Sequence, residues 1–523
     1  MTLRSDIIRK LTEIVDPERM LMDPEDLYVY SFERVFEDTK YPDFDAVVRA
    51  NSEDEIIEIG QLAEAEGLTI INRGEDTVAH ESRETKGSGT IILDTVPPLE
   101  IAALDVKITA RFEQLRERRQ KLMDAFREGP SYKSLALAVE SLFHRGAISQ
   151  CKDCEICTGY CTVSPHFNHV ETYSAKGRHL LMRGLMRGEL KPSKRLADIL
   201  YSCTLCGLCY AQCTPDLHLD EAILEARGRM AKEGLAPESA KTALRNVLEQ
   251  GNPMGASREL RARWMRRLPQ NLLEKKADML YWAGCNTTLR SGVRSTANAT
   301  VKVLSAAGIN LTTFGEREGC CGFSLIVGGL FKEAKRNAEQ VAKKVDEAGV
   351  EMLVTSCSGC YETFTDFYPN RLGVEIPCPV FHSSQLLIRQ AKNYDLKLNR
   401  LPLKVTYHDP CGLGRHCGVY DPPRRLLKSI PGLQLIEPEL SRERSRCCGG
   451  GGGLWGVDSG ASMSLAIQRI REDIMPLNIE ALAVSCPLCH TNFLYTLKRH
   501  GVGLRVYDIV EFVEIALRNG NAD

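Results

Sequence analysis

Four short apolar runs in the C-terminal half of the chain each end at cysteine. They are DMLYWAGC at 278–285, MLVTSCSGC at 352–360, LKVTYHDPC at 403–411 and ALAVSCPLC at 481–489. A short apolar run bounded by turn or polar residues is typical of a buried β-strand. The pattern therefore predicts two pairs of strands, each strand with cysteine at its carboxyl end.

Helical patterns separate the two strands of each pair. FKEAKRNAEQVAKKVDEAG, at 331–349, and SMSLAIQRIREDIMPLN, at 462–478, repeat apolar positions at helical spacing. Alternating strands and helices predict β-α-β units with a parallel sheet in each half. Because the carboxyl ends of parallel strands gather at one edge, we expect the cysteines of each half to converge.

The bulk composition excludes several classes of partner. The chain has 523 residues with 67 basic and 69 acidic side chains, and its net charge of -2 provides no global field for nucleic acid or a membrane surface. No run approaches the roughly 20 apolar residues that cross a bilayer, and the charged start MTLRSDIIRKLTEIVDPE is unlike a signal peptide. We expect a cytoplasmic protein, either free or held at the membrane periphery by a partner.

Twenty cysteines are unusual for such a protein, because cytosolic thiols seldom form structural disulfides. None precedes residue 151, where the run CKDCEICTGYC begins, and a second run, CTLCGLCYAQC, begins at residue 203. Both read C-x2-C-x2-C-x3-C, a spacing typical of ferredoxin-type [4Fe–4S] sites. Paired zinc sites are the alternative, but zinc motifs usually separate their two cysteine pairs by a longer stretch.

In two-cluster ferredoxins the fourth cysteine of each run binds the other cluster. We therefore predict one cubane cluster on Cys151, Cys154, Cys157 and Cys213. The other is predicted on Cys203, Cys206, Cys209 and Cys161. Two such clusters in series transfer electrons and provide no substrate site.

The later cysteines form an internal repeat of one cysteine, an adjacent pair followed by glycine, and a C-x2-C pair. The first five-cysteine set is Cys285, Cys320, Cys321, Cys357 and Cys360. The second five-cysteine set is Cys411, Cys447, Cys448, Cys486 and Cys489. Five thiolates are too many for one zinc ion or a simple cubane, but they can hold a larger cluster, to which Gly322 and Gly449 let the backbone approach. A vicinal disulfide or a redox-sensing thiol pair is the alternative.

The motifs around these sets resemble a known family. TYHDPCGLGRHCGVYDPPRRLLKSIPG at 406–432, CCGGGG at 447–452 and SCPLC at 485–489 are similar to the CCG domains of heterodisulfide reductase, in particular its catalytic D subunit. In that protein two ferredoxin-type cubanes precede two CCG domains, and the resemblance covers about residues 140–515. It implies a non-cubane [4Fe–4S] cluster on each five-cysteine set, with a mixed disulfide of coenzyme M and coenzyme B split between them.

The resemblance implies an iron–sulfur oxidoreductase that acts as the catalytic subunit of a heterodisulfide reductase-type complex. Both sets are whole here, which favours disulfide chemistry over electron relay. The alternative is the electron-transfer iron–sulfur subunit of a glycolate or lactate dehydrogenase, or of a complex linked to electron-transferring flavoprotein. The expected partners are a small-molecule disulfide and an electron-donor subunit, which in the family is a membrane cytochrome, a flavoprotein or a hydrogenase-linked protein.

Three histidines lie beside cluster ligands in the sequence. Cleavage of a disulfide yields two thiolates that need neutralisation in a dry pocket. His408, His416 and His490 are candidates for supplying protons or for hydrogen-bonding to sulfur. The family has a histidine directly after the cysteine of the DPC motif, whereas this chain has Gly412, so His416 is the candidate replacement.

Three other features have expected roles from local sequence. Arg424, with its neighbour Arg425, opens a predicted helix after DPP and is a candidate for binding an anionic group of the substrate, with a solvated surface position as the alternative. RELRARWMRRLP at 258–269 is expected to join two domains or to dock a partner. Cys378 and Cys417 lie outside both sets and are expected to be ordinary buried thiols.

The first hundred residues resemble the start of the flavin-binding domain of glycolate and D-lactate dehydrogenases, with a P…VV strand, a helix, a strand ending NRG and a later strand. Those enzymes place a glycine-rich loop after that arginine so that backbone amides reach the flavin pyrophosphate. Here the loop reads EDTVAHES, in which Glu75 and Asp76 would repel phosphate, and a charged helical segment begins at about Arg111. We therefore do not expect FAD, and interpret the region as a docking surface or a cap on the iron–sulfur core.

The predicted class is α/β, with a helical two-cluster ferredoxin-like module and two tandem βαβ-type CCG domains after a small α+β region. The predicted parts are a truncated flavin-domain-like region at 1–103, a helical linker at 104–145, a ferredoxin-type domain at 146–250, and CCG domains at 251–395 and 396–523.

Overall fold

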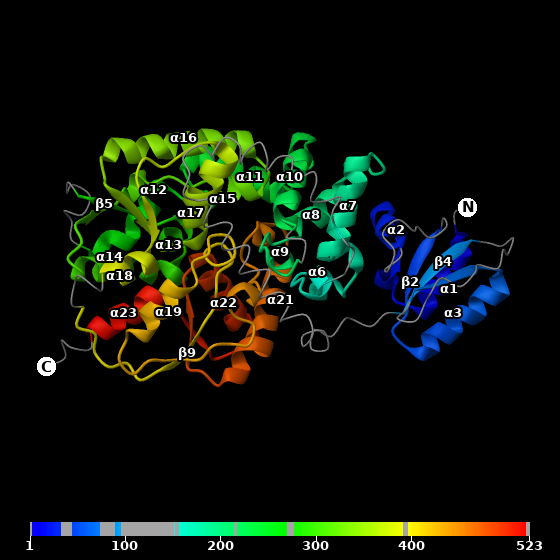
Figure 1. Ribbon diagram of the computed structural model, residues 1–523. Coiled ribbons are helices and arrows are strands. Elements are labelled where there is room, and N and C mark those ends of the chain that lie inside the picture. The colour runs from blue at the N-terminus through cyan, green and yellow to red at the C-terminus, as the bar shows by residue number, and fades with distance from the viewer. Residues whose placement is uncertain are drawn as a thin grey trace. The chain divides into compact units, whose positions relative to one another are not determined.

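The structure is a computed structural model that describes residues 3–32, 44–73, 89–95, 151, 156–213, 217–268, 277–390 and 396–518. The predicted linker at 104–145, Cys154, and the loop with Glu75 and Asp76 lie outside these residues. The chain divides into two compact units, one of Met1–Lys191 with Cys213–Leu217 and one of Pro192–Gln212 with His218–Asp523 (Figure 1). The five-part division stays a prediction.

The first unit contains, within its described residues, a sheet with the strand order β1-β2-β4-β3. Its strands are β1 (Met20–Leu21), β2 (Ala46–Arg49), β3 (Thr69–Arg73) and β4 (Thr90–Asp94), and only the β1–β2 pair is antiparallel. Helices α1 (Ser5–Ile14) and α3 (Glu53–Glu66) bury apolar side chains against the sheet (Figure 1). The predicted strand ending NRG is thus β3.

The segment that includes the end of the first cysteine run and the residues after it packs against this small domain within the first unit. It contains α6 (Ile156–Gly159), two 3-10 turns (Ser164–Phe167 and Glu171–Tyr173) and α7 (Ala175–Arg187). Arg73 Nη2 donates to Glu171 Oε2 at 2.7 Å, and Thr172 Oγ1 donates to Asp26 Oδ1, at the start of α2 (Pro24–Tyr30), at 2.5 Å. These buried polar contacts tie residues 171–172 to the sheet and α2.

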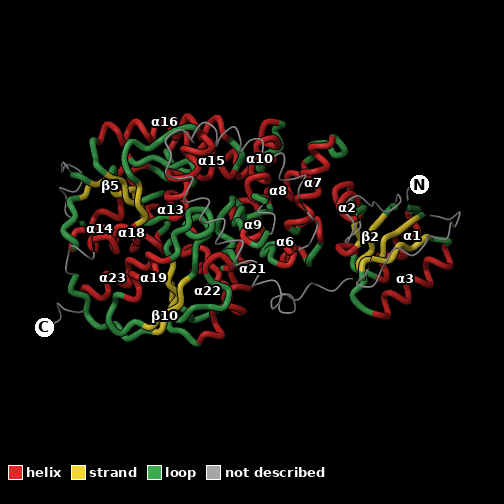
Figure 2. Tube along the Cα trace, in the orientation of Figure 1, coloured by secondary structure: helices red, strands yellow, loops and turns green. Residues whose placement is uncertain are grey.

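The second unit contains two parallel sheets with the same topology. Their strand orders are β6-β5-β7-β8 and β10-β9-β11-β12. In each half the first strand along the chain pairs with the second strand on one side and with the third strand on the other. Figure 2 shows strands in yellow. The strands are β5 (Met279–Trp282), β6 (Leu311–Thr312), β7 (Met352–Thr355), β8 (Val380–His382), β9 (Lys404–Tyr407), β10 (Gln434–Leu435), β11 (Ala481–Val484) and β12 (Arg505–Asp508). The duplication and the α/β class are therefore confirmed.

Helices precede the sheets and fill the connections between their strands. Those before the first sheet are α8 (Lys194–Tyr201), α9 (Leu208–Ala211), α10 (Leu219–Lys232), α11 (Glu238–Gln250) and α12 (Arg258–Arg261), with a 3-10 turn at Ala262–Arg267. The first half adds α13 (Cys285–Leu289), α14 (Arg294–Ala306), α15 (Phe323–Val327), α16 (Phe331–Ala348), α17 (Ser358–Glu362), a π-helix (Thr363–Leu372) and α18 (Ser383–Gln390). The second half adds α19 (Asp421–Lys428), α20 (Leu454–Val457), α21 (Ser459–Arg469), α22 (Pro487–His500) and α23 (Ile509–Arg518).

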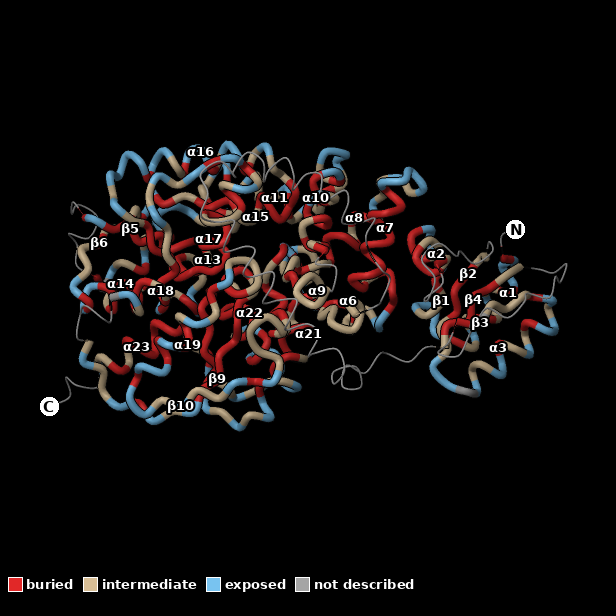
Figure 3. The backbone as a smooth tube through the Cα atoms, viewed as in Figure 1, coloured by how far each residue is buried: buried red, intermediate tan, exposed pale blue. Residues whose placement is uncertain are grey.

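The two predicted helices differ in how closely they follow their patterns. Helix α16 is amphipathic, with a largely exposed outer face (Figure 3), and ends at Gly349, whose φ of 60° is left-handed. In the second half α21 ends at Arg469 and continues as a π-helix (Ile470–Ile474) and a 3-10 turn (Met475–Leu477). Pro476 cannot donate an intrahelical hydrogen bond, which explains why the regular helix is not maintained there.

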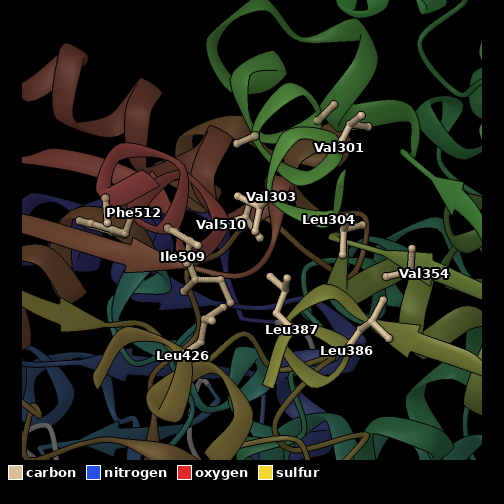
Figure 4. Close-up of a cluster of buried hydrophobic side chains, with 14 of the residues drawn as sticks. Val301, Val303, Leu304, Val354, Leu386, Leu387, Leu426, Ile509, Val510 and Phe512 are labelled. Atoms are coloured by element: carbon tan, nitrogen blue, oxygen red, sulfur yellow. The ribbon is translucent and has the colours of Figure 1, made fainter. Parts of the chain in front are cut away.

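One hydrophobic core joins the two halves of the second unit. Val303 and Leu304 of α14, Leu387 of α18, Leu426 of α19 and Val510 of α23 belong to the same buried cluster (Figure 4). These residues come from both halves, so the halves are packed against each other. Their sheet edges consequently hold fixed positions relative to one another.

No helix within the described ranges combines the length and the apolar character needed to cross a membrane.

Candidate iron–sulfur sites

The parallel sheets position both five-cysteine sets at the carboxyl ends of their strands. In the first half Cys285 follows β5, the pair Cys320–Cys321 comes after β6, and the C-x2-C pair follows β7. The second half repeats this order after β9, β10 and β11. In sheets of this order the topological switch point lies between the first and third strands, because the connections from these strands run in opposite directions. Open α/β sheets bind ligands at the switch point.

The thiols of the first set form a continuous row. Neighbouring thiols interact in the order Cys285, Cys320, Cys321, Cys360 and Cys357. All five side chains are buried, with no more than 7% of any residue exposed. Five thiols in one dry space are thus available to a single inorganic group.

The second set forms a matching row. Cys411 interacts with Cys447 and Cys447 with Cys448, while the sulfurs of Cys448 and Cys489 lie 3.2 Å apart. Cys489 in turn contacts Cys486. The row therefore passes through the cysteines in the same order as in the first set.

The two rows meet at Cys357 and Cys486, whose thiols interact directly. Beside them, Ser358 Oγ of the first half donates to the carbonyl of Ser485 at 2.6 Å. The ten thiols of the two sets thus lie in one connected interior region of the second unit. Cys357 and Cys486 are 129 positions apart in the sequence, and the sequence repeat alone does not predict that they meet.

Interactions within each row shift the pKa values of its thiols. Hydrogen bonds with Cys320 and Cys360 lower the pKa of the Cys321 thiol well below its usual range. Hydrogen bonds with Cys447 and Cys489 do the same for the pKa of Cys448. The second cysteine of each adjacent pair therefore has a lowered pKa, and a thiolate is the form that binds metal.

Backbone amides also face the sulfurs. Gly322 N donates to Cys320 Sγ and Gly449 N donates to Cys447 Sγ, each at 3.3 Å. A Cβ on Gly449 would lie 2.3 Å from the carbonyl oxygen of Ser462, and its φ is 79°, so this turn requires glycine. The described cysteines are all free thiols. Buried, unpaired thiols that also receive N–H···S bonds fit iron–sulfur clusters better than a vicinal disulfide.

The cysteines of the two ferredoxin-type runs are divided between the units. Cys151, Cys157, Cys161 and Cys213 belong to the first unit, whereas Cys203, Cys206 and Cys209 belong to the second. In the first unit Arg178 Nη1 lies 3.8 Å from Cys161 Sγ. The predicted grouping of these eight cysteines stays a prediction.

Cys206 lies next to the second five-cysteine set, which sequence reasoning missed. Its thiol hydrogen-bonds to Cys447, and that interaction, followed by burial, raises the pKa of Cys206 well above its usual value. Arg415 Nε donates to the Cys206 carbonyl at 2.6 Å, and the His416 ring donates to the Leu205 carbonyl at 3.1 Å. The second cysteine run is therefore anchored on the second half.

Arg227, on α10, links the second cysteine run to both halves. Its side chain is fully buried and donates to the carbonyls of Leu200 and Cys203 beside that run. It also donates to Val327, in the first half, at 2.8 Å and to Gly452, in the second half, at 2.7 Å. These five hydrogen bonds use all five donors of the guanidinium, so Arg227 holds three loops in a fixed arrangement.

His408 is the predicted histidine that the structure places among the thiols. A ring nitrogen of His408 and the sulfurs of Cys448 and Cys489 lie within 4.8 Å of one another. Arg469 Nε donates to His408 Nδ1 at 3.0 Å, so the neutral ring carries its proton on Nε2, which has no protein partner in the described part of the chain. Burial and then the Arg469 charge lower the pKa of His408 well below its ordinary value.

The first half has tryptophan at the corresponding position. Trp282 and His408 each precede the single cysteine of their set by three residues. Trp282 packs edge-to-face on Phe364 with ring centroids 5.2 Å apart, and His408 packs in the same way on Phe493 at 5.0 Å. The duplicated architecture is thus retained, and each ring has a buried nitrogen, Trp282 Nε1 or His408 Nε2, with no protein partner among the described residues.

The other two histidines are engaged elsewhere in the second unit. His416 Nε2 donates to Leu205, and its Nδ1 lies 3.6 Å from Asp220 Oδ2, close to the second cysteine run. His490 Nε2 donates to the Val506 carbonyl at 3.1 Å, and burial lowers its pKa to about 4. Both rings therefore stabilise loops or strands around the sites.

Arg424 is buried, with 4% of its surface exposed, and the alternative of a solvated position is wrong. It makes a bidentate pair with Asp409 at 2.6 and 2.8 Å and a second with Glu437 at 2.8 and 2.9 Å. The Tyr420 carbonyl accepts its fifth hydrogen bond. No donor is left for a substrate anion, so the contacts support a structural role.

Three further expectations are changed by burial. Cys378 and Cys417 are only partly buried, because both lie at the margins of apolar clusters. Arg261, within the stretch expected to be a linker, is buried with 1% exposed and donates to Cys285.

Sequence reasoning did not identify Arg469. Its spacing from Leu465 and Ala466 places it on the inward face of α21, so the helical periodicity is a signal that could have found it.

Comparison with known proteins agrees with this arrangement. A family model described as a 4Fe-4S dicluster domain matches residues 147–217, and one described as a cysteine-rich domain matches residues 279–365 and 405–494. The two cysteine-rich matches coincide with the two halves of the second unit. Iron–sulfur clusters are thus the cofactors of these domains.

Relatives extend the match over most of the chain. The D subunit of dihydromethanophenazine:CoB–CoM heterodisulfide reductase from Methanosarcina mazei is 31% identical over 356 residues, which cover 66% of this chain and 84% of that protein. The iron-sulfur-binding oxidoreductase FadF of Bacillus subtilis is 31% identical over 60% of this chain and 46% of its own length. EtfAB:quinone oxidoreductase of Syntrophomonas wolfei is 29% identical over the same shares. The chain therefore belongs to the family of the heterodisulfide reductase D subunit, and is an iron–sulfur oxidoreductase with a dicluster domain and two cysteine-rich domains.

Proposed function

We propose that the chain reduces a disulfide between its two five-cysteine sets, with the mixed disulfide of coenzyme M and coenzyme B as the first candidate. Each set would hold a non-cubane [4Fe–4S] cluster, and the two cysteine runs would hold two cubane [4Fe–4S] clusters. The observation that carries this proposal is the contact of Cys357 with Cys486, through which the two sets adjoin. The relative from Methanosarcina mazei, whose name specifies CoB–CoM heterodisulfide, supports the choice of substrate.

Two adjoining sets suit the stoichiometry of the reaction. Reduction of R–S–S–R′ consumes two electrons and two protons and releases R–SH and R′–SH. When bound, the two non-cubane clusters supply one electron each and a metal to which a product thiolate can bind. The protein's part is to keep the sets adjacent, which Ser358 and the shared core support, and to exclude water from buried thiols.

His408 is proposed to stabilise sulfur at the second set. Its Nε2–H has no protein acceptor among the described residues, and Arg469 prevents the ring from presenting the opposite tautomer. A neutral ring in this position can donate a hydrogen bond to developing negative charge on sulfur. The first half has Trp282 there, whose indole Nε1–H likewise has no protein acceptor among the described residues, so a buried donor is available at the equivalent position of each half.

Electrons are proposed to enter at the second set. Cys206, from the second cysteine run, contacts Cys447, and its carbonyl is held by Arg415. A cubane cluster on that run would therefore lie next to the second five-cysteine set. The external donor would be a partner subunit, namely a membrane cytochrome, a flavoprotein or a hydrogenase-linked protein.

An electron-relay function is the second candidate. The relative named EtfAB:quinone oxidoreductase favours it, because this chain shares 29% identity with that protein over 332 residues. Under this proposal electrons from a flavoprotein, such as electron-transferring flavoprotein or a glycolate or lactate dehydrogenase, would pass through the clusters without disulfide cleavage. Electron-transferring flavoprotein should then reduce the clusters and should co-purify with the chain.

The deciding experiment uses anaerobically purified protein, reduced viologen and the coenzyme M–coenzyme B disulfide. We expect two viologen electrons to be consumed, and two thiols to be released, for each disulfide. The variant Cys378→Ser, outside both sets, is the matched control and should retain this activity. A preparation with full iron content that leaves the disulfide intact would exclude the first proposal and favour the relay.

A further inference from the structure

Arg261 makes a direct contact with a thiol of the first five-cysteine set. Its Nη2 donates to Cys285 Sγ at 3.1 Å, and 1% of its surface is exposed. Arg261 is the last residue of α12, a short helix that precedes the first sheet. A guanidinium is always charged at physiological pH, so this contact places a full positive charge at one cysteine of the set.

Buried acceptors fix the orientation of the guanidinium. Arg261 Nη1 donates to Glu318 Oε1 at 2.8 Å and to the Gly319 carbonyl at 3.0 Å, while Nη2 also donates to the Gly251 carbonyl at 3.2 Å. Glu318 in turn accepts from the backbone amides of Ala283 and Gly284, both at 2.9 Å. The carboxylate therefore joins the backbone just before Cys285 to the arginine that contacts its sulfur.

The second five-cysteine set differs at the same positions. Glu318 stands two residues before the adjacent cysteine pair, where the second half has Ser445. The arginine near the second set, Arg415, places its charge near Cys411 and Cys447, but directs its hydrogen bonds to the carbonyls of Cys206, Glu443 and Ser445. The arginine-to-sulfur bond thus belongs, among the described contacts of the two sets, to the first set.

We propose that Arg261 raises the reduction potential of the cluster on the first set, so that an electron arriving at the second set passes to the first. Hydrogen bonds to sulfur and nearby positive charge stabilise the more negative, reduced form of an iron–sulfur cluster. Electrons are proposed above to arrive at the second set, whose Cys447 contacts Cys206 of the second cysteine run. This inference rests on the proposed function, because it requires a cluster at each set.

The test is a redox titration of the complete, cluster-loaded protein, followed by electron paramagnetic resonance. Arg261→Met removes both charge and donors, and Arg261→Lys keeps the charge and one donor. We expect the midpoint potential of one non-cubane signal to fall in Arg261→Met, to fall less in Arg261→Lys, and the other signals to stay in place. Arg258→Met, an exposed residue of the same helix, should change nothing.

Iron content separates the two kinds of failure. If wild-type protein lacks the non-cubane signals, the proposed function fails and the role of Arg261 fails with it. If Arg261→Met keeps all clusters and all midpoints, the inference is overturned. If Arg261→Met loses the first cluster, the midpoint potential of that cluster in Arg261→Lys provides the test. An unchanged midpoint potential in Arg261→Lys would also overturn the inference.

Discussion

Cys357 and Cys486 interact directly across the two halves of the second unit. Each directly follows a serine whose hydroxyl pairs with a buried tyrosine. Tyr281 and Ser356 oxygens lie 2.9 Å apart in the first half, and Tyr407 and Ser485 oxygens lie 2.6 Å apart in the second. The meeting point of the two sets is consequently anchored from both sheets by equivalent contacts.

His382 should make the stability of this meeting point depend on pH. Its Nε2 donates to the Ser485 carbonyl at 3.2 Å, and burial lowers its pKa to about 4. The unfolded ring, with its ordinary pKa of about 6.5, binds more protons, so stability is full above that pH and is lost as the pH falls toward 4. Between pH 7.5 and 5.5 this ring should account for about 1.4 kcal/mol.

Anaerobic urea unfolding of wild type and His382→Gln at those two pH values measures that contribution. The variant keeps a donor for Ser485 but does not titrate, so its loss of stability on acidification should be smaller by that amount. His500→Gln, an exposed position, serves as the control and should behave as wild type. Equal pH dependence in wild type and His382→Gln would refute this role of the ring.

Gly452 should resist substitution because it touches the second cysteine run. Its φ is 60°, and a Cβ would lie 2.1 Å from the carbonyl oxygen of Thr204. Gly418 has a similar φ of 71° but nothing within 4 Å of its Cβ position. Gly418→Ala should therefore cost only the left-handed backbone strain, about 1–2 kcal/mol, whereas Gly452→Ala should also displace the loop that carries Cys203 and Cys206.

Thermal unfolding and cubane electron paramagnetic resonance of the two glycine variants test this expectation. We expect a larger loss of stability and a perturbed cubane signal in Gly452→Ala alone. Equal losses with unaltered signals in both variants would mean that the approach of Gly452 to Thr204 is not important.

Replacement of Arg227 should loosen the arrangement of three loops. Arg227→Met would leave the buried carbonyls of Leu200, Cys203, Val327 and Gly452 without this donor. Because each unsatisfied buried group costs about 1–3 kcal/mol, we expect a loss of at least about 3 kcal/mol. Arg245→Met, on exposed α11 surface, is the matched control. Anaerobic urea unfolding measures both, and similar stabilities would contradict the bridging role.

His408→Gln should impair disulfide reduction while leaving the clusters in place. If Nε2–H stabilises a product thiolate, its loss should reduce kcat by about 10²-fold or more. Iron content and the viologen-reduced spectra should equal those of wild type, as should the activity of the His500→Gln control. Full activity in His408→Gln would leave the Arg469–His408 pair with a structural role alone.

The sequence was sufficient for the repeated elements and insufficient for the contacts between them. Apolar runs ending in cysteine predicted the strands that precede both sets, because burial and turn residues are local signals. The contact of Cys206 with Cys447 was missed because it depends on how a helical module packs on a sheet edge. Arg261 and Arg227 were missed for a related reason, since a buried arginine is indistinguishable from a surface one without its acceptors.

In the N-terminal region, too, the sequence predicted the elements but not the contacts between them. The resemblance to flavin-binding domains correctly placed the strands β2, β3 and β4, whose register is parallel throughout. It did not indicate that Arg73, at the end of β3, would bind Glu171 of the segment after the first cysteine run. That contact supports the interpretation of the region as a cap within the first unit, while the loop at Glu75 and Asp76 lies outside the described residues.

Anaerobic iron and sulfide analysis tests the central claim most directly, if it compares wild type with a variant in which Cys320, Cys321, Cys447 and Cys448 are all replaced by serine. Four clusters of four irons require about sixteen irons per chain in wild type, and loss of both non-cubane clusters should leave about eight. A wild-type protein with only about eight irons, or one rich in zinc, would contradict the account.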